Sequence, residues 1–368
     1  MEGRRATATE RLELDRNENP YPWPRPWIEE LAGRLARRGP ARYPGGRGAL
    51  EAELVRYARE SAGAGPAGEA PAAELAAVAT NGSDEALQAA VLAFTRPGEA
   101  VVYLEPGFGM YPRVAEVTGR RPRPVALGPR WQVDGAALRA ALEEERAAGR
   151  EVLAILCRPN NPTGHLWPLE EVEAAAETGA WVLVDEAYFE FAGETALGLV
   201  ARHPRLLVAR TFSKAFGMAG LRLGYVLGRP EAVDRLRAVL APYSVNTVAV
   251  EAGRMLLEPE RLAQVRRWIA ALVAERERLA AELERIPGLA VVPSRTNFLL
   301  VEVNPAGSGW EAVRLWRALA DRGVLLRYLG GEVERLRAAL RWSVARPEED
   351  ERALEVLRRL VGLREVAG

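Results

Sequence analysis

The segment around Lys214 carries the residue types needed for covalent chemistry on a carbonyl compound. Lys214 is the only lysine among the 50 basic residues of the chain, and all the others are arginines. Thr211 and Ser213 precede it by three residues and one residue, and Arg222 follows it by eight. Nearby cations and poor solvation lower the pKa of a lysine amine and make it nucleophilic. The segment therefore predicts a lysine that attacks a carbonyl group beside a bound anion.

An acidic residue follows the apolar run Trp181–Val184. Asp185 is therefore expected at the carboxyl end of a strand, where ligands of open α/β sheets bind. A carboxylate in that position can pair with a protonated ring nitrogen, and Tyr188, three residues on, could reach the same ligand. An Asp-Glu pair after a strand also suggests a magnesium-dependent ATPase, but the chain has no GxxxxGK[ST] loop.

Two further turns at predicted strand ends offer polar groups. Ser83 and Asp84 follow the apolar run Ala76–Ala79 and open a predicted helix, whose free N–H groups suit a phosphate. The turn Pro159–Gly164 is rigid, can contain a cis peptide bond, and would hold Asn161 at the same sheet edge as the carboxylate. Taken singly, the first is also an ordinary helix start and the second an ordinary turn.

One ligand matches all four features. Pyridoxal phosphate has a phosphate, a basic ring nitrogen, a phenolic oxygen and an aldehyde. The sequence thus predicts pyridoxal 5'-phosphate held through a Schiff base to Lys214, with no metal ion at the site.

Alternating apolar and amphipathic segments must position these groups. Strand-length apolar runs are typical of strands buried on both faces, and helix-like segments separate them, which predicts an α/β domain with a mostly parallel sheet. The expected strands are Ala76–Ala79, Ala100–Leu104, Val152–Leu156, Trp181–Val184, Leu206–Ala209 and Gly224–Leu227. The expected helices include Ser83–Phe94, Asp134–Ala148 and Leu169–Thr178.

The two ends of the chain differ from this middle part. Residues 1–20 are expected to form an arm, followed by a helix over Arg25–Arg38, and the segments Arg42–Gly48 and Gly63–Pro71 are expected to be loops. The last third predicts a smaller α+β lobe. Its expected elements are a long helix over Ala263–Arg285, strands over Leu289–Pro293, Asn297–Val303, Val324–Tyr328 and Ala339–Val344, a helix near Trp310–Arg322 and a final helix from Glu348.

Composition narrows the function classes. The 368 residues include 50 acidic and 50 basic ones, and this balance gives no electrostatic reason to expect nucleic acid or an anionic membrane as a partner. The charged first residues lack the apolar core of a signal peptide, and no apolar run approaches the ~20 residues of a membrane helix. A single cysteine, Cys157, excludes internal disulfides and cysteine clusters. A cytoplasmic protein is the default expectation.

Several motifs together resemble the fold-type I pyridoxal-phosphate enzymes, in the class I and II aminotransferase family. The resemblance extends from Asn17-Glu18-Asn19-Pro20-Tyr21 to Leu340-Arg341-Trp342-Ser343-Val344, with Asn-Asn-Pro-Thr-Gly, Asp-Glu-Ala-Tyr and Ser-Lys-Ala-Phe-Gly between. It implies a large domain with a mixed, mostly parallel seven-stranded sheet between helices, plus a smaller α+β domain. The implied division is an arm over 1–45, a cofactor-binding domain over 46–255 and a small domain over 256–368.

The resemblance also implies roles in holding the cofactor. Lys214 would bind it covalently and, once freed by the substrate amine, move a proton from the substrate α-carbon. Asp185 would keep the ring nitrogen protonated, Tyr188 and Asn161 would contact the phenolic oxygen, and Phe108 would stack on the ring. The residues implied around the phosphate are Ser83, Asp84, Thr211, Ser213 and Arg222.

Within the family, the chain most resembles the histidinol-phosphate aminotransferases. That branch implies transfer of an amino group between histidinol phosphate and 2-oxoglutarate in histidine biosynthesis, by a homodimer in which Tyr43 reaches the partner subunit's phosphate. Tyr21, Arg327 and Arg341 would bind the substrate, because two guanidinium groups suit a dianionic phosphate. In an arginine-rich chain, either arginine could instead belong to a structural ion pair.

Three departures from the family pattern bear on the substrate. Arg158 stands where asparagine is usual, Ala345-Arg346-Pro347 replaces Gly-Thr-Pro, and Pro22-Trp23-Pro24 lacks a common glycine. The alternatives on the same scaffold are an aminotransferase for aromatic or other amino acids and a threonine-phosphate decarboxylase. A cofactor-sensing regulator without catalysis is more remote, because no helix-turn-helix pattern precedes the body of the chain. A nicotinamide dehydrogenase would need a GxGxxG motif after a strand, which the sequence lacks.

Overall fold

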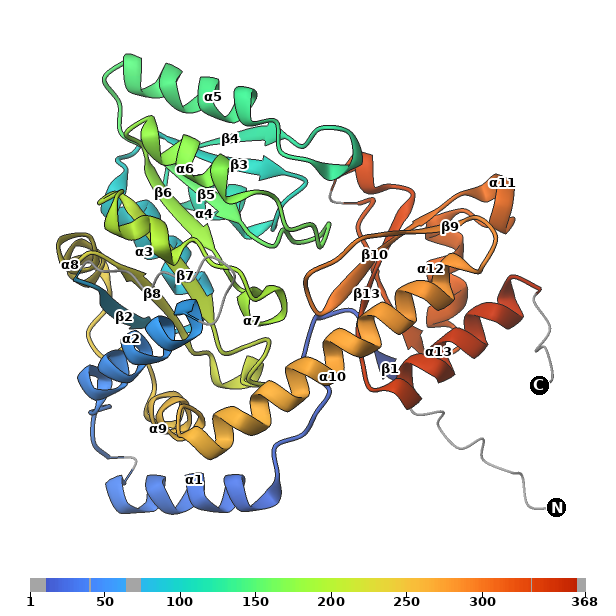
Figure 1. Ribbon diagram of the computed structural model, residues 1–368, viewed down its shortest axis with the longest axis horizontal. Helices are drawn as coiled ribbons and strands as arrows, with labels where there is room; N and C mark the ends of the chain where they lie inside the picture. Colours follow the sequence, from blue (N-terminus) through green and yellow to red (C-terminus); the bar gives the residue numbers. More distant parts are fainter. Residues whose placement is uncertain (1–10, 40, 64–73, 332, 363–368) are drawn as a thin grey trace.

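The computed structural model describes residues 11–39, 41–63, 74–331 and 333–362. Within these residues, a seven-stranded sheet forms the centre of the larger part of the molecule (Figure 1). The sheet order is β2 (Ala76–Thr80), β8 (Gly224–Gly228), β7 (Leu206–Thr211), β6 (Trp181–Asp185), β5 (Val152–Cys157), β3 (Ala100–Glu105) and β4 (Arg121–Ala126). Only β8 runs antiparallel to its neighbours in this sheet. The predicted mixed, mostly parallel sheet is confirmed.

The apolar runs became strands because both faces of the sheet are covered. In β5, Val152, Ala154 and Leu156 belong to one buried cluster, whereas Leu153 and Ile155 belong to the other. Alternate side chains of a strand point to opposite faces, so a strand buried on both sides is apolar throughout. One face packs against α3 (Gly82–Phe94), α4 (Met110–Val117) and α8 (Pro230–Val239); the other packs against α2 (Arg47–Gly63), α5 (Gly135–Ala147) and α6 (Leu169–Glu177).

Two elements of the larger part differ from the sequence-based expectation. The sequence did not predict β4, whose residues Arg121–Ala126 include two prolines; this strand is at the edge of the sheet, where a missing N–H is tolerated. The loop expected over Arg42–Gly48 ends at Gly46, because Arg47 and Gly48 begin α2. Leu50 and Leu54 of α2 are fully buried, so tertiary packing stabilises this helix despite its glycine-rich start. Most of the loop expected over Gly63–Pro71 lies outside the described residues, and Gly63 ends α2.

The smaller part of the molecule is an antiparallel sheet covered by helices. Its strand order is β12 (Arg327–Tyr328), β13 (Ala339–Ser343), β10 (Phe298–Val303) and β9 (Leu289–Val292). The long helix α10 (Pro259–Glu284) runs from the larger part to this sheet (Figure 1). The remaining helices are α1 (Arg25–Arg38), α7 (Phe189–Ala192), α9 (Thr247–Leu256), α11 (Pro305–Ser308), α12 (Ala312–Ala320) and α13 (Pro347–Leu360). The helix predicted over Arg25–Arg38 is confirmed at both ends.

The strand expected over Val324–Tyr328 is wrong as a single element. It divides into β11 (Val324–Leu325) and β12, which belong to different sheets. β11 pairs in parallel with β1 (Leu12–Glu13) of the amino-terminal arm, while β12 pairs with β13. The arm thus extends the small part by two residue pairs, which no local pattern could indicate. Among the described helices, none is long and apolar enough to cross a membrane.

A buried ion pair fixes the turn that follows β6. The Glu186 carboxylate accepts hydrogen bonds from Arg210 Nε at 3.0 Å, from Thr195 Oγ1 at 2.8 Å and from the Ala196 N–H at 2.6 Å. Neither charged side chain is exposed to solvent. The Arg210 guanidinium also lies 3.6 Å from the ring centroid of Phe189. Because Glu186 follows Asp185 directly, these contacts fix the backbone that presents the predicted site residues.

Replacing Arg210 with methionine should destabilise the protein, because it leaves the Glu186 carboxylate buried without its cation. We expect a loss of about 3 kcal/mol in the free energy of unfolding, measured by urea denaturation. Arg267→Met is the matched control, since Arg267 is exposed and, among the residues that the structure describes, bonds only to Gln264 three residues earlier. Its loss should stay below about 0.5 kcal/mol. Equal unfolding midpoints for the two variants would contradict this account of the turn.

Candidate active site

A cavity of about 170 Å³ lies where the carboxyl ends of β5, β6 and β7 meet the first turn of α3. Eleven of the fourteen predicted site residues line this cavity, namely Ser83, Asp84, Phe108, Asn161, Asp185, Tyr188, Thr211, Ser213, Lys214, Arg222 and Arg341. Carboxyl ends of parallel strands share one edge of a sheet, so segments far apart in sequence converge there. As the sequence analysis allowed, cis peptide bonds precede Pro159 and Pro162 in the turn after β5.

Lys214 is the nucleophile candidate of this cavity. Burial is the main cause that lowers the pKa of its amine, to about 8, and the positive charges of Arg341 and Arg222 lower it further. Glu18 and Asp84 act in the opposite direction. Its Nζ donates to the backbone carbonyl of Arg16 at 3.3 Å. About a tenth of the amine is therefore neutral at pH 7, far more than for a lysine in water, and the neutral form is the one that attacks a carbonyl.

Asp185 ends β6 as a buried carboxylate. Burial raises its pKa to about 6, and two donors oppose that change. Tyr111 Oη donates to Oδ2 at 2.8 Å, and the Ala187 N–H donates to Oδ1 at 3.1 Å. Tyr111 itself is 1 % exposed and lies edge-on to Phe108, with ring centroids 5.7 Å apart. These donors favour the ionised form, which is the form that can pair with a protonated ring nitrogen.

An anion cradle lies at the start of α3. Arg222 donates to the Asp84 carboxylate at 2.9 Å and to Ser213 Oγ at 3.4 Å, and Ser213 Oγ is 3.0 Å from Thr211 Oγ1. The first N–H groups of a helix have no partner within it, and together with a guanidinium and two hydroxyls they form a donor set suited to a phosphate. The cradle thus fits the phosphate of pyridoxal phosphate.

Strand β8 packs so closely against the turn at Gly82 that Gly224 has no room for a side chain. A Cβ atom on Gly224 would lie 2.5 Å from the carbonyl carbon of Gly82 and 2.6 Å from the Ser83 nitrogen. Gly82 has a φ of 74° and Arg222 a φ of 58°, both in the left-handed region. A non-glycine residue in that region marks local strain that tertiary contacts must maintain. The start of β8 therefore packs directly against this turn, and Arg222, two residues before Gly224, places its guanidinium beside Gly82.

Asn161 and Arg341 connect the larger part to the smaller one. Arg341 Nη1 donates to Asn161 Oδ1 at 2.9 Å, which leaves the amide N–H groups of Asn161 as donors for a ligand oxygen. Arg341 Nη2 donates to the Asp15 carbonyl at 2.7 Å. Arg327 is exposed and does not line the cavity, but it is the cross-strand partner of Arg341 in the β12–β13 pair. Directly opposed residues of an antiparallel pair point to the same face, so the two arginine side chains leave the sheet on the same face.

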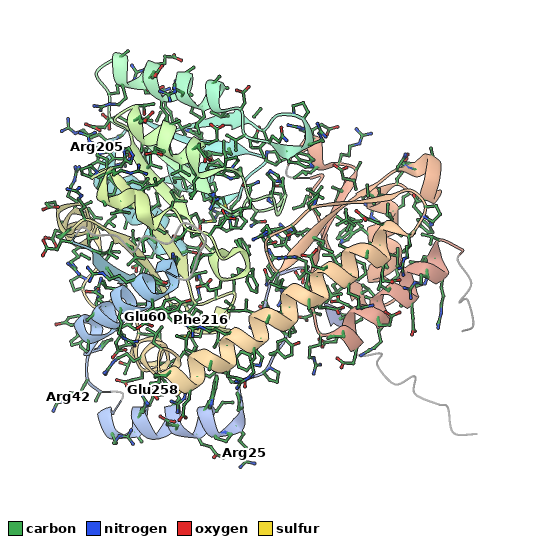
Figure 2. The ribbon with its side chains drawn as sticks, viewed as in Figure 1. Arg25, Arg42, Glu60, Arg205, Phe216 and Glu258 are labelled. Atoms are coloured by element: carbon green, nitrogen blue, oxygen red, sulfur yellow. The ribbon has the colours of Figure 1, made fainter. Side chains whose placement is uncertain are left out.

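Besides Arg327, two predicted residues do not line the cavity of their own chain. Tyr43 is 76 % exposed, and its ring stacks on that of Tyr243 with centroids 4.6 Å apart. Its neighbour Arg42 projects away from the body of the fold (Figure 2). Tyr21 is half-buried and stacks on Trp268 at 6.2 Å. The role of Tyr43 in a partner's site and that of Tyr21 in substrate binding remain predictions.

None of the three departures from the family pattern lines the cavity. Arg158 is buried and donates to the Trp167 carbonyl and to Glu194. Arg346 caps α13 through Glu349, and Trp23 Nε1 donates to the Phe216 carbonyl. The expectation that these residues border the substrate side finds no support in the cavity lining.

Residues that sequence reasoning missed complete the lining. They are Arg16, Asn17, Cys157 and Ala187, with Tyr111 just behind Asp185. Asn17 belongs to the motif on which the resemblance rests, and Tyr111 lies three residues after Phe108, so both were close to identified signals. No local pattern, however, indicates which side of the arm or of α4 faces the cavity.

Comparison with known proteins agrees with this geometry. The family Aminotransferase class I and II matches residues 9–357. The chain is 37% identical over 356 residues to the histidinol-phosphate aminotransferase of Desulfitobacterium hafniense, covering 94% of this chain and 91% of that one. It is 36% identical over 358 residues to the same-named protein of Thermococcus gammatolerans, covering 97% and 94%.

Solved structures give the same fold. The histidinol-phosphate aminotransferase of Sinorhizobium meliloti in complex with pyridoxal-5'-phosphate is 26% identical, with a TM-score of 0.78 over 96% of this chain and 91% of that one. The N-succinyldiaminopimelate aminotransferase of Mycobacterium tuberculosis is also 26% identical, with a TM-score of 0.79 over 95% and 93%. Structural likeness therefore does not separate one amino donor from another.

Removing the Tyr111 hydroxyl should weaken the affinity for pyridoxal phosphate in a pH-dependent way. Tyr111→Phe deletes a donor to the Asp185 carboxylate, so the pKa of Asp185, about 6 in the native chain, rises further. A higher pKa means a larger protonated fraction at any given pH, and the protonated acid cannot pair with a protonated ring nitrogen. The fall in affinity on acidification should therefore begin at a higher pH, with binding up to about tenfold weaker at pH 7.

Fluorescence titration of the cofactor-free protein from pH 5.5 to 8.5 measures this effect. The matched control is Tyr103→Phe, because Tyr103 packs beside Tyr111 with ring centroids 6.4 Å apart but does not line the cavity. If both variants show the pH profile of the native chain, Tyr111 has no influence on the carboxylate.

Proposed function

The chain belongs to the class I and II aminotransferase family, and on that premise we propose that it transfers an amino group between histidinol phosphate and 2-oxoglutarate, in histidine biosynthesis. Pyridoxal phosphate is its cofactor. The single observation that carries the proposal is the position of Lys214. The only lysine of the chain lies in the one cavity that also holds the anion cradle, the carboxylate and the amide, among the residues described.

The residues that line the cavity have separate roles in binding the cofactor and in moving a proton. The bound cofactor supplies an electron sink for the carbanion that forms at the substrate α-carbon. With the cofactor bound, the Asp185 carboxylate would hold the proton on the ring nitrogen, and the Tyr188 hydroxyl and the Asn161 amide would donate to the phenolic oxygen. The Lys214 amine removes the proton from the α-carbon of the substrate, and its pKa of about 8 is suited to a base at neutral pH.

The pair Arg327 and Arg341 supports a phosphate-bearing substrate. Arg341 lines the cavity, and its cross-strand neighbour Arg327 lies on the same face, toward solvent. Two arginines on one face can supply charge-assisted, bidentate bonds to a dianion. A carboxylate would need only one of them, which favours histidinol phosphate over an ordinary amino acid. The names of the similar proteins agree with this choice.

A homodimer with shared sites follows from the same premise. Tyr43 is exposed and is not among the residues that line its own chain's cavity, as expected for a side chain that reaches the phosphate in a partner subunit. The division into residues 1–45, 46–255 and 256–368 is proposed likewise, with α10 connecting the last two parts (Figure 1). A cytoplasmic location completes the proposal.

A half-reaction tests the substrate assignment. The purified protein loaded with pyridoxal phosphate is mixed with histidinol phosphate, and the absorbance of the bound cofactor is followed as it takes up the amino group. We expect rapid conversion, reversed by 2-oxoglutarate. Conversion by phenylalanine or glutamate, but not by histidinol phosphate, would refute the assignment, and release of carbon dioxide from threonine phosphate without use of 2-oxoglutarate would replace transamination with decarboxylation.

Lys214→Ala removes the only side-chain amine, so no side chain can hold the cofactor covalently. Borohydride treatment followed by mass spectrometry should find the cofactor on the native protein and none on a side chain of the variant. Turnover should fall by about 10³-fold or more, because the base is lost as well. Lys214→Arg is the control for charge: arginine keeps the cation but cannot lose its proton, so it should be equally inactive. Substantial turnover in either variant would overturn the central role of Lys214.

A further inference from the structure

Asn17 of the amino-terminal arm is one of the most constrained residues in the molecule. Its side chain is 1 % exposed and its backbone has a φ of 55°, in the left-handed region. Asparagine tolerates that region better than most residues. Its carbonyl accepts a hydrogen bond from Asn297 Nδ2 at 3.1 Å. The cofactor-holding roles described above assign no part to Asn17, although it lines the cavity.

The direction of each hydrogen bond around Asn17 follows from one fixed donor. The Asn17 backbone N–H donates to Ser343 Oγ at 2.8 Å, and an N–H group can only donate. Ser343 Oγ still has one proton of its own to place, and among the described residues its other hydrogen-bond neighbour is the Asn17 side chain, so it donates to Asn17 Oδ1 at 2.9 Å. This bond decides which end of the amide is oxygen. The nitrogen, Nδ2, consequently faces Tyr188 Oη, to which it donates at 3.0 Å.

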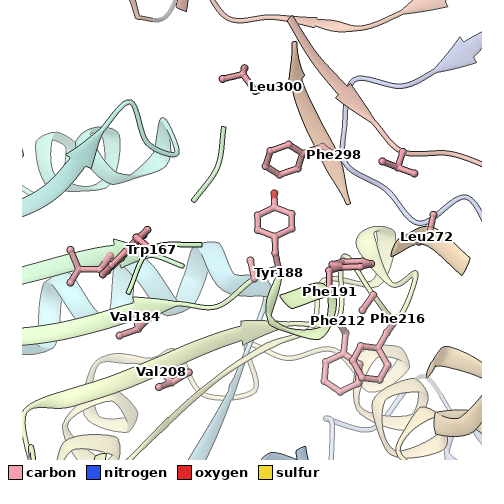
Figure 3. Packing of buried hydrophobic residues seen from close by; sticks show 14 of the residues in the cluster. Trp167, Val184, Tyr188, Phe191, Val208, Phe212, Phe216, Leu272, Phe298 and Leu300 are labelled. Carbon is pink, nitrogen blue, oxygen red and sulfur yellow. The ribbon is translucent and has the colours of Figure 1, made fainter. Parts of the chain in front are cut away.

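The Tyr188 hydroxyl is thereby an acceptor from the arm. Because Asn17 donates to this hydroxyl, the single proton of the hydroxyl points away from Asn17, toward another acceptor. Its ring is held edge-on by Phe298, with centroids 5.2 Å apart and planes at 82°, and Figure 3 shows the hydroxyl end of Tyr188 directed toward Phe298 at the boundary of the two parts. Since Tyr188 also lines the cavity, the cavity is where an acceptor for that proton can lie.

The same stretch of the arm is bound to the site at three successive carbonyls. The carbonyl of Asp15 accepts from Arg341, that of Arg16 accepts from Lys214, and that of Asn17 accepts from Asn297. These donors come from both parts of the molecule. The arm is therefore positioned by the site itself, and Asn17 cannot shift relative to Tyr188 without breaking several bonds.

We propose that Asn17 is a positioning residue, which sets the Tyr188 hydroxyl as a donor toward the phenolic oxygen of the bound cofactor. By donating to Tyr188 Oη, the amide leaves the Tyr188 proton free for the ligand. The proposal rests on the cofactor assigned above. It predicts that Asn17 influences the charge state of the bound cofactor through the Tyr188 hydroxyl.

The test is a pH titration of the absorbance of the cofactor-loaded protein. Asn17→Asp keeps the size of the side chain and can still accept from Ser343, but it can no longer donate to Tyr188. The hydroxyl proton turns to the new carboxylate, and the phenolic oxygen loses its donor and meets a negative charge. Both effects favour the protonated form of the bound cofactor, so the midpoint of the absorbance change should rise by roughly one pH unit. An unchanged midpoint would overturn the proposal.

Asn17→Gly separates orientation from charge. Glycine adopts the same φ without strain, and it removes the amide without adding a carboxylate. In the native background the midpoint should rise, by less than in Asn17→Asp. In a Tyr188→Phe background the same change should have no further effect, because Asn17 acts only through the tyrosine hydroxyl. Independent, additive shifts in the two backgrounds would contradict the proposed role.

The outcomes also separate this proposal from the assigned function. If the native protein binds no pyridoxal phosphate, both fail. If it binds the cofactor and Tyr188→Phe moves the midpoint, but neither Asn17 variant does, the function stands and the role of Asn17 is refuted. Thermal unfolding of each variant without cofactor checks that the substitution leaves the protein folded.

Discussion

The amine of Lys214 must be neutral for part of the time while it lies near two arginines and beside a cavity built to hold an anion. Burial and the charges of Arg341 and Arg222 lower its pKa to about 8, and the carboxylates of Glu18 and Asp84 limit the shift. A lysine in water would be almost fully protonated at neutral pH. The reactivity of this residue therefore depends on the surroundings that the whole fold assembles.

The opposite requirement applies to Asp185, only a short distance away in the same cavity. Its carboxylate must stay ionised although burial raises its pKa to about 6. Donation from Tyr111 and from the Ala187 N–H favours the charged form. One cavity thus holds a base with a pKa of about 8 and an acid with a pKa of about 6, both shifted toward neutral pH, and perturbed pKa values of this kind cluster at sites that carry out proton transfer.

These groups depend on support from segments that carry no chemistry. Glu186 and Arg210 fix the turn after β6, and β8 presses against the Gly82 turn closely enough that Gly224 has no room for a side chain. The arm contributes backbone carbonyls that accept hydrogen bonds from residues of the cavity, as that of Arg16 does from Lys214. The site therefore lies where the larger part, the smaller part and the arm meet, and each of the three constrains the others.

The sequence by itself determined the alternation of strands and helices, the mixed sheet, and the four segments that converge on the cavity. It could do so because buried strands have continuous apolar runs and because parallel strands place their carboxyl ends at one edge. It did not indicate β4, the start of α2 or the division of residues 324–328, since edge position and packing partners decide those. Nor did it indicate the contacts of Tyr111 or Asn17. Hydrogen bonds between residues as distant as Asn17 and Ser343 are decided only when the chain has folded, because no local pattern encodes which buried donor meets which acceptor.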